Sequence, residues 1–365
     1  MPYVSTDKIL KYATEHHIAH GAFNVNALCQ AEAIIEACEE LRCAAIIQVA
    51  EPGLAYIGGR ADFLNGTMEE KILGANRIAK FVKELAEKTF IPVALHLDHG
   101  RSFESCKACI DAGFNSVMID GSALDYEDNV ALVTKVVNYA HERGVAVEGE
   151  LGVLAGVEDH VFSESSTYTN PLTAVDFIKR THCDSLAISY GTKHGAVKGD
   201  NVKLRKEIVI ATMENLKHEH LNAAIVSHGS SLVPEYIVNE INNLGGQVKG
   251  KGVPLNQLKE VIPCGISKIN MDTDIRLATT RNLLEYFDAH KEKRETSKIY
   301  NLLVEKRESF EYRYYLKEYI NELETNEGFN DELKEIVPLL KKAVKEIVLT
   351  ASVEFGSIGD AIYIK

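Results

Sequence analysis

Three histidines stand where a short apolar run meets a glycine: His99 in VALHLDHG, His194 in SLAISYGTKHG and His228 in AAIVSHGSS. Each run contains β-branched residues and is short enough to be a buried strand. In parallel α/β barrels, the reactive side chains gather at the carboxyl ends of the strands. Three imidazoles at such ends, with a fourth coordination position left open, predict a catalytic zinc site.

A carboxylate directly precedes the first of these histidines. Because side chains alternate along a strand, Asp98 and His96 face the same side. If His99 binds a metal ion at the strand's end, Asp98 comes within reach of a metal-bound substrate and can transfer a proton. The alternative is that His96 and Asp98 form a buried hydrogen-bonded pair with a structural role.

Two further carboxylates, Glu148 and Glu150, alternate on the fifth expected strand and face the same side. Burying a carboxylate without a partner is costly, and a nearby cation is its natural partner. Glu150 is therefore a candidate auxiliary metal ligand. A salt bridge inside the barrel is an equally open interpretation.

Features suited to an anion follow the last expected strands. Small and hydroxyl-bearing residues expose backbone N–H groups and add donors, and a helix N-terminus favours negative charge. In such barrels, the loops after the seventh and eighth strands often hold a phosphate. The candidate residues are Gly195, Lys198, Gly229, Ser230, Ser231, Asp272 and Thr273. Asp272 or Thr273 can instead be a simple helix cap, which is compatible with a phosphate contact.

These side chains need a scaffold that brings strand ends together. The sequence contains eight strand-like runs, at residues 20–25, 44–50, 92–98, 116–120, 145–151, 185–189, 223–228 and 267–272. Amphipathic segments separate them, and helices are expected at Ala31–Leu41, Glu70–Lys88, Tyr126–Arg143 and Pro171–Thr181. Eight alternating units predict an α/β fold of the (β/α)8 TIM barrel type.

Three segments depart from this alternation. Residues 152–171 are long, polar and poor in helix formers, which predicts a mobile lid, with a plain surface loop as the alternative. The glycine-rich residues 245–254 predict a turn before the last strand. Beyond about Arg281 the pattern is mostly helical and charged. We therefore expect one domain over residues 1–365, of which residues 281–365 form a helical C-terminal extension.

Composition narrows the class of protein. The 365 residues carry 40 Lys and Arg against 53 Asp and Glu, and this formal charge of −13 argues against a nucleic-acid partner. Seven cysteines, an odd number, indicate reduced thiols in a cytoplasmic protein. The lone CxxC of Cys106 and Cys109 is better explained as buried thiols than as metal ligands. We expect no membrane association, because a signal-peptide core and the ~20-residue apolar run of a membrane helix are both missing.

Several segments are very specific when taken together: GAFNVN, HLDHG, GFNSVMIDGS, VEGELG, GVED, GTKHG, SHGSS and KINMDTDIR. On these segments the chain closely resembles the class II, metal-dependent fructose-bisphosphate aldolases from about residue 1 to 285. The resemblance implies a (β/α)8 barrel, assembled as a homodimer or homotetramer. It also implies one zinc ion on His99, His194 and His228, with Glu150 able to approach an alternative metal position. A monovalent cation as an activator is left open.

The resemblance further implies roles for individual residues. Asp98 matches the aspartate that exchanges a proton with the C4 hydroxyl, and Glu158 matches the loop glutamate that moves a proton at C3. Asn270 matches the residue that contacts the bound enediolate. Contacts with the phosphorylated sugar substrate are implied for Asn24, Gly195, Lys198, Gly229, Ser231, Asp272, Thr273 and Arg276.

The activity implied is reversible cleavage of fructose 1,6-bisphosphate to dihydroxyacetone phosphate and glyceraldehyde 3-phosphate, a step of glycolysis and gluconeogenesis. Ala50 stands where the family usually has serine, so a tagatose, deoxy-sugar or sulfo-sugar phosphate remains open as the substrate. A lysine Schiff-base aldolase using Lys198, a metallohydrolase and a non-catalytic metal-binding paralogue are also open interpretations. The presence of Asp98, Glu158 and Asn270 argues against the non-catalytic paralogue.

Overall fold

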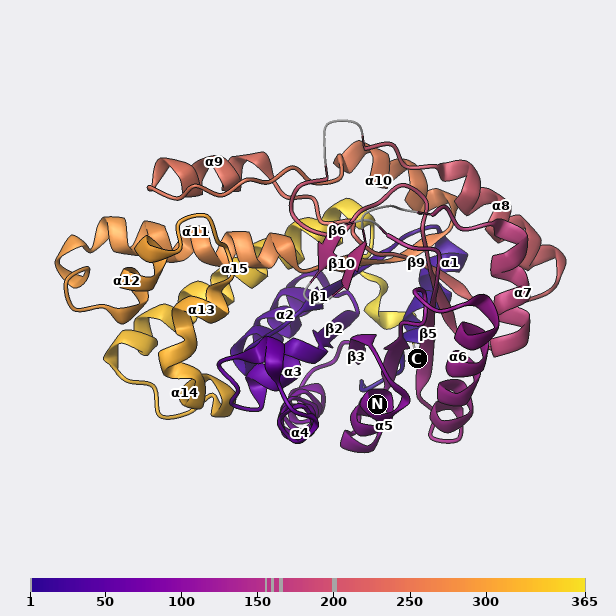
Figure 1. Cartoon of the computed structure of the whole chain (residues 1–365), viewed down its shortest axis with the longest axis horizontal. Helices are drawn as coiled ribbons and strands as arrows, with labels where there is room; N and C mark the ends of the chain where they lie inside the picture. Colours follow the sequence, from indigo (N-terminus) through magenta and orange to yellow (C-terminus); the bar gives the residue numbers. More distant parts are fainter. Residues whose placement is uncertain (1, 155, 159–160, 164–166, 199–201, 365) are drawn as a thin grey trace.

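The computed structural model describes residues 2–154, 156–158, 161–163, 167–198 and 202–364 (Figure 1). Eight parallel strands close into a barrel, because the first strand pairs with both the second and the last. The order around the barrel is β1-β10-β9-β8-β5-β4-β3-β2. The strands are β1 (His20–Asn24), β2 (Ala45–Ala50), β3 (Val93–Gly100), β4 (Ser116–Ile119), β5 (Ala146–Leu151), β8 (Ser185–Ile188), β9 (Ala224–Ser227) and β10 (Ile266–Met271). The prediction of a TIM barrel is confirmed, with each strand within two residues of its expected bounds.

Helices alternate with the strands and surround the barrel. Those up to the last strand are α1 (Thr6–His16), α2 (Leu28–Leu41), α3 (Glu51–Ile57), α4 (Met68–Ala86), α5 (Phe103–Ala112), α6 (Tyr126–His141), α7 (Pro171–Thr181), α8 (Lys206–His218), α9 (Glu235–Asn243) and α10 (Leu255–Val261). Side-chain caps fix where several of them begin. Thr67 and Glu70 form a capping box at the start of α4, and Asn170 caps α7 before Pro171 at its first turn.

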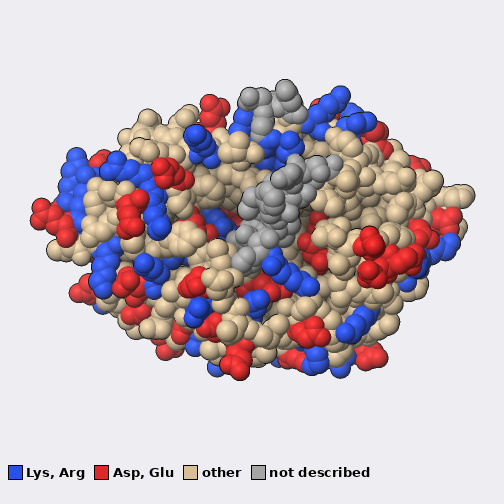
Figure 2. All heavy atoms as spheres, in the orientation of Figure 1, with Lys and Arg blue, Asp and Glu red and all other residues tan. Residues whose placement is uncertain are grey.

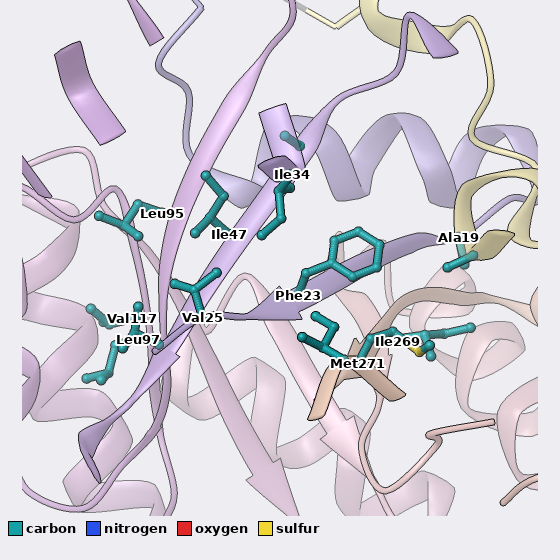
Figure 3. Close-up of a cluster of buried hydrophobic side chains, with 14 of the residues drawn as sticks. Ala19, Phe23, Val25, Ile34, Ile47, Leu95, Leu97, Val117, Ile269 and Met271 are labelled. Carbon is teal, nitrogen blue, oxygen red and sulfur yellow. The ribbon is translucent and has the colours of Figure 1, made fainter. Parts of the chain in front are cut away.

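Alternation along the strands separates the two faces of the barrel wall. In β3, Leu95 and Leu97 point outward into the main apolar core, together with Ile47 of β2 and Ile269 of β10 (Figure 3). Ile34 of α2 packs on the same layer. Burial of this outward layer against the helices holds the barrel together, and it leaves the inward positions free for polar side chains.

After the last strand the chain is helical, as expected, in α11 (Thr273–Ala289), α12 (Lys298–Glu305), α13 (Tyr312–Leu316), α14 (Ile320–Thr325) and α15 (Asp331–Phe355). Helices α12, α13 and α14 gather to one side of the barrel (Figure 1). They enclose a second apolar cluster that includes Phe287, Tyr312 and Leu333. The long α15 returns along α2 and α11, so the C-terminal extension packs on the barrel.

Two of the irregular segments contain more structure than expected. Within residues 152–171, β6 (Gly156–Glu158) and β7 (Val161–Ser163) pair antiparallel, where a loop without strands was expected. Residues 245–254 include a bridge between Lys251 and Val197, and α10 lies between them and β10. Among the residues described, no helix is both long and apolar enough to cross a membrane. Acidic and basic side chains are interspersed over the face shown in Figure 2.

All seven cysteines are free thiols. Cys106 and Cys109 lie on α5 and are buried, as the sequence predicts.

Candidate active site

The backbone is irregular at the end of β3, where His99 lies. Its φ of +46° is in the left-handed region, which residues with a side chain rarely adopt. The pairing of β3 with β4 shifts register between Leu97 and Gly100. Regular alternation would place His99 outward beside Leu97, so this bulge turns the imidazole toward the carboxyl ends of the neighbouring strands.

Two imidazoles converge there. Nε2 of His99 lies 3.0 Å from Nδ1 of His228, which follows β9. The other nitrogen of each ring faces a carboxylate: His99 Nδ1 is 3.1 Å from Asp120 Oδ2, and His228 Nε2 is 2.7 Å from Glu148 Oε1. If both outer nitrogens donate to these carboxylates, two lone pairs face each other at 3.0 Å, an arrangement that a cation between them would relieve.

The charges around His99 also favour a cation. Burial alone would lower the pKa of His99, but the carboxylates of Asp98, Asp120 and Glu150 raise it well above its ordinary value. Burial lowers the pKa of His228, despite its hydrogen bond to Glu148, so this ring is neutral. Positive charge is therefore favoured between the two rings, and the donor set suits a divalent metal ion.

The remaining candidate ligands lie beside this pair. The ring of His194 is buried, with its centroid 5.6 Å from that of His99. A carboxylate oxygen of Glu150 is 3.9 Å from His99 Nδ1. Ligand atoms of Asp98, His99 and His228 lie within 4.8 Å of one another, and so do those of His99, Asp120 and Glu150. His99, His228 and the carboxylates beside them thus fit a metal ion, whereas His194 belongs to neither of these groups and lies next to His99 by its ring.

Asp98 is buried and held by amides from three strands. Asn24 Nδ2 donates to its Oδ2 over 2.8 Å, and Asn270 Nδ2 donates to its Oδ1 over 3.0 Å. Gln48 Nε2 lies 3.4 Å from Oδ2 and donates to Asn24 Oδ1 over 2.6 Å. Asp98 and His96 share a facing as predicted, but His96 bonds to Ser116 and Lys268 rather than to Asp98. Asp98 is therefore oriented by neutral donors beside the convergent imidazoles.

Several of the expected anion-binding residues lie in the loops that follow β8 and β9. Gly195 and Gly229 have φ values of +83° and +61°, and a Cβ on Gly229 would lie 2.5 Å from the carbonyl oxygen of Lys193. The loop after β8 and the loop after β9 therefore approach each other through their backbones. Lys198 is buried and its ammonium donates to that same carbonyl oxygen. Ser230 is buried against Ser227 over 2.6 Å.

Asp272 stands at the N-cap position of α11 without a side-chain hydrogen bond that caps the helix, and Thr273 is the first residue of the helix. Arg276 binds Asp272 over 2.5 Å and Glu311 of the C-terminal extension over 2.6 Å. Asp274, one residue further along α11 than Thr273, is fully buried, and its Oδ1 accepts from the backbone N–H of Val233 over 2.8 Å. Glu158 lies in β6, and its side chain is outside the part of the structure that is described.

Sequence reasoning missed several polar residues: Gln48, Asp120 and Lys268 on or beside the barrel strands, and the buried Asp274 on α11. Three of them had a usable signal. Asp120 directly follows the fourth strand, where functional side chains gather, and Lys268 precedes Asn270 by two residues and so shares its facing. Gln48 has the same relation to Ala50 on β2.

Known proteins are similar to this chain over most of its length. A family model described as fructose-bisphosphate aldolase class-II matches residues 4–360. A fructose-bisphosphate aldolase of Treponema pallidum is 42% identical over 289 residues, covering 76% of this chain and 84% of that protein. One from Giardia intestinalis is 36% identical over 301 residues, covering 80% and 85%.

Solved structures are similar over nearly the full length. The YdjI aldolase from Escherichia coli K12 has a TM-score of 0.66 and 26% identity, covering 98% of this chain and 99% of that one. The fructose-bisphosphate aldolase from Campylobacter jejuni has a TM-score of 0.71 and 22% identity, covering 98% and 96%, and shows the fold alone.

Proposed function

The chain belongs to the class II fructose-bisphosphate aldolases, and from this premise we propose that it cleaves fructose 1,6-bisphosphate reversibly into dihydroxyacetone phosphate and glyceraldehyde 3-phosphate. The enzyme is an aldehyde-lyase of a metal-dependent family. The observation that carries the site assignment is the 3.0 Å approach of His99 Nε2 to His228 Nδ1 beside the buried Asp98.

His99, His194 and His228 are the ligands we assign to a divalent ion, with Glu150 as an auxiliary ligand; His99, His228 and Glu150 are supported by their converging ligand atoms, and His194 by its buried ring beside His99. Zinc is our choice, because imidazole nitrogens suit it and the family is metal-dependent. When bound, such an ion supplies Lewis acidity to the oxygens of a ketose and stabilises negative charge as C3–C4 breaks.

Asp98 acts on the proton of the C4 hydroxyl. In cleavage its carboxylate accepts that proton, the C4–O bond becomes the aldehyde carbonyl, and the electron pair of C3–C4 stays with C3. The amides of Asn24 and Asn270 hold both carboxylate oxygens, so the acceptor is oriented before the substrate arrives. In condensation the same proton returns to the oxygen at C4.

Glu158 is assigned the proton transfer at C3, an assignment that rests on its matching position in the family motif GVED. Gly195, Lys198, Gly229, Ser230, Ser231 and Thr273 are assigned to the phosphate of the three-carbon product. Positive φ at both glycines supports this, because it lets backbone N–H groups turn toward an anion. Asp272 and Arg276 are assigned to the other end of the substrate.

The test is a coupled assay of cleavage with purified enzyme, before and after treatment with a chelator. We expect fructose 1,6-bisphosphate to be cleaved, activity to disappear with the metal, and added Zn²⁺ to restore it. Tagatose 1,6-bisphosphate and further ketose phosphates are run in parallel, because Ala50 pairs in register with Asp98 and places a methyl group there. Full activity in metal-free enzyme, or trapping of substrate on Lys198 by borohydride, would overturn the metal assignment.

We also propose a homodimer or homotetramer with no nucleic-acid partner. Light scattering at several protein concentrations tests the assembly directly.

A further inference from the structure

A buried ion pair crosses the inside of the barrel below the candidate metal centre. Lys268 is the third residue of β10 and Glu148 the third residue of β5, so neither lies at a strand end. Their side chains are 0% and 1% exposed, and 2.7 Å separates Lys268 Nζ from Glu148 Oε2. Apolar side chains of similar volume often replace a buried ion pair without loss of stability. This pair is therefore poorly explained by stability alone.

The second oxygen of the carboxylate faces the candidate centre. Glu148 Oε1 lies 2.7 Å from His228 Nε2, so each carboxylate oxygen has its own partner. The positive charge of Lys268 and the hydrogen bond from His228 hold the pKa of Glu148 well below its usual range, although burial alone would raise it. Glu148 is thus an acceptor at both oxygens.

Lys268 also fixes the direction of the hydrogen bonds on its other side. Its Nζ lies 3.2 Å from His96 Nε2, and His96 Nδ1 lies 2.7 Å from Ser116 Oγ. An ammonium group has donors only, so His96 Nε2 must accept and its Nδ1 donates to the serine. The ammonium group therefore cannot exchange roles with either neighbour.

These hydrogen bonds determine which ring nitrogen of His228 carries the hydrogen. Because the ion pair with the ammonium group holds Glu148 as a carboxylate, its second oxygen Oε1 can only accept, and His228 Nε2 must carry the hydrogen. The lone pair is then on Nδ1, the nitrogen that lies 3.0 Å from His99 Nε2. A metal ligand needs that lone pair directed at the ion.

We propose that Glu148 and Lys268 are positioning residues that lock His228 in the Nε2–H tautomer and so present Nδ1 as the metal ligand. The inference rests on the proposed function, in which His228 binds the ion. Lys268 acts on His228 through Glu148. Its ammonium group binds Oε2 of the carboxylate, so that only Oε1 is left to accept from the imidazole.

Glu148→Gln tests the lock without changing the size of the side chain. The amide has one oxygen, and both Lys268 and His228 Nε2–H require it. The charged ammonium group takes the oxygen, the NH₂ group faces the imidazole, and the hydrogen moves to Nδ1. We expect the Kd for Zn²⁺ to rise about 10- to 100-fold, the range found when the outer partner of a ligating histidine is lost.

A second substitution should reverse this effect. In Glu148→Gln with Lys268→Met, the amide oxygen is free to accept from His228 Nε2–H again. We expect the Kd to recover by about tenfold or more relative to the single variant. The matched control is Ser116→Ala, which removes a hydrogen bond at the far end of the same network and should leave the Kd for Zn²⁺ unchanged.

The tautomer is read directly by ¹⁵N NMR of histidine-labelled, metal-free wild-type enzyme, with His228 assigned from the signals lost in His228→Asn. We expect a protonated Nε2 and a bare Nδ1 in the wild type, and this measurement does not depend on a variant that folds. The opposite tautomer in the wild type would overturn the proposal. So would a Kd unchanged in Glu148→Gln, or a double variant as weak as the single one.

The metal site and the role of the ion pair can be tested separately. If wild-type enzyme binds no divalent ion, or binds it equally well in His228→Asn, then the proposed metal site is wrong. If the wild type binds the ion through His228 but Glu148→Gln leaves the affinity and the tautomer unchanged, only the role of the ion pair is wrong.

Discussion

His20 and Asp360 form a buried ion pair, with 2.6 Å between Nε2 and Oδ2, at the end of the barrel opposite the candidate active site. His20 is the first residue of β1, whereas Asp360 lies in the short helical turn Asp360–Ile362 near the end of the chain. Asp360 Oδ1 also accepts from the backbone N–H of Ala44 over 3.0 Å. The last residues of the chain are therefore tied across the bottom of the barrel.

This tie predicts a pH dependence of stability. Burial alone would lower the pKa of His20, but Asp360 raises it above its ordinary value. A histidine with a raised pKa contributes stability that is complete below about pH 6.5 and is lost as pH rises through the folded-state pKa. We expect Asp360→Asn to lower the free energy of unfolding by about 3–5 kcal/mol at pH 6 and by less at higher pH.

Urea unfolding of wild type and Asp360→Asn between pH 5 and 9 measures this difference. The control is Asp331→Asn, because that side chain is 99% exposed and its loss should leave the pH profile unchanged. A constant difference between wild type and Asp360→Asn over the whole range contradicts the prediction.

Asp98→Asn should lower kcat by about 10²- to 10⁴-fold, because the amide cannot accept the hydroxyl proton. It should retain the metal ion, since the histidine ligands are unaltered. Asp120→Asn is the contrasting variant: Asp120 faces His99 Nδ1 at 3.1 Å, so its loss should weaken metal binding. Metal analysis and steady-state kinetics of both variants separate the two roles, and equal metal loss in both would contradict them.

The buried carboxyl group of Asp274 should make the free energy of unfolding depend on pH. Burial raises its pKa to about 6, so the folded protein holds a proton between about pH 4 and 6 that the unfolded chain has released. The contribution of Asp274 to stability therefore falls as pH rises through this window. Asp274→Asn keeps an oxygen for the N–H of Val233 and has no such dependence.

We expect the stability of Asp274→Asn relative to wild type to increase by about 3 kcal/mol from pH 4 to pH 7. Chemical unfolding at closely spaced pH values measures the change. A relative stability that is flat, or that falls with pH, is the opposing result.

Gly252 should tolerate no side chain, because an added Cβ would lie 2.0 Å from the carbonyl oxygen of Leu232 and 2.5 Å from that of Ser231. Gly252→Ala must displace the turn to which we assign phosphate binding. We expect a raised KM for fructose 1,6-bisphosphate and a loss of about 1–3 kcal/mol in stability.

Gly144→Ala is the control for this substitution. Gly144 has a φ of +68° and open space around it, so alanine adds backbone strain of about 1–2 kcal/mol at a turn that leads into the start of β5. Its KM should equal that of wild type. If the KM of Gly252→Ala is unchanged, the assignment of phosphate binding to this turn is wrong.

The sequence by itself determined the eight strands and the facing of their side chains. The period of two along a strand sets which residues share a side, so the spacing alone groups Glu148 with Glu150. Hydrophobic runs indicate where the strands lie, because a strand covered on both faces is richer in apolar residues than an exposed one. The class of site followed from histidines that recur at strand ends.

Only the tertiary structure decided which side chains meet. Alternation assigns His99 to the outward face, and the bulge with φ of +46° that reverses this depends on how β3 pairs with β4. The contact of Lys268 with Glu148 requires β10 and β5 to face each other across a closed barrel, 120 residues apart in the chain. A local pattern carries no information on barrel closure, because closure is set by long-range strand pairing and by the packing of the surrounding helices.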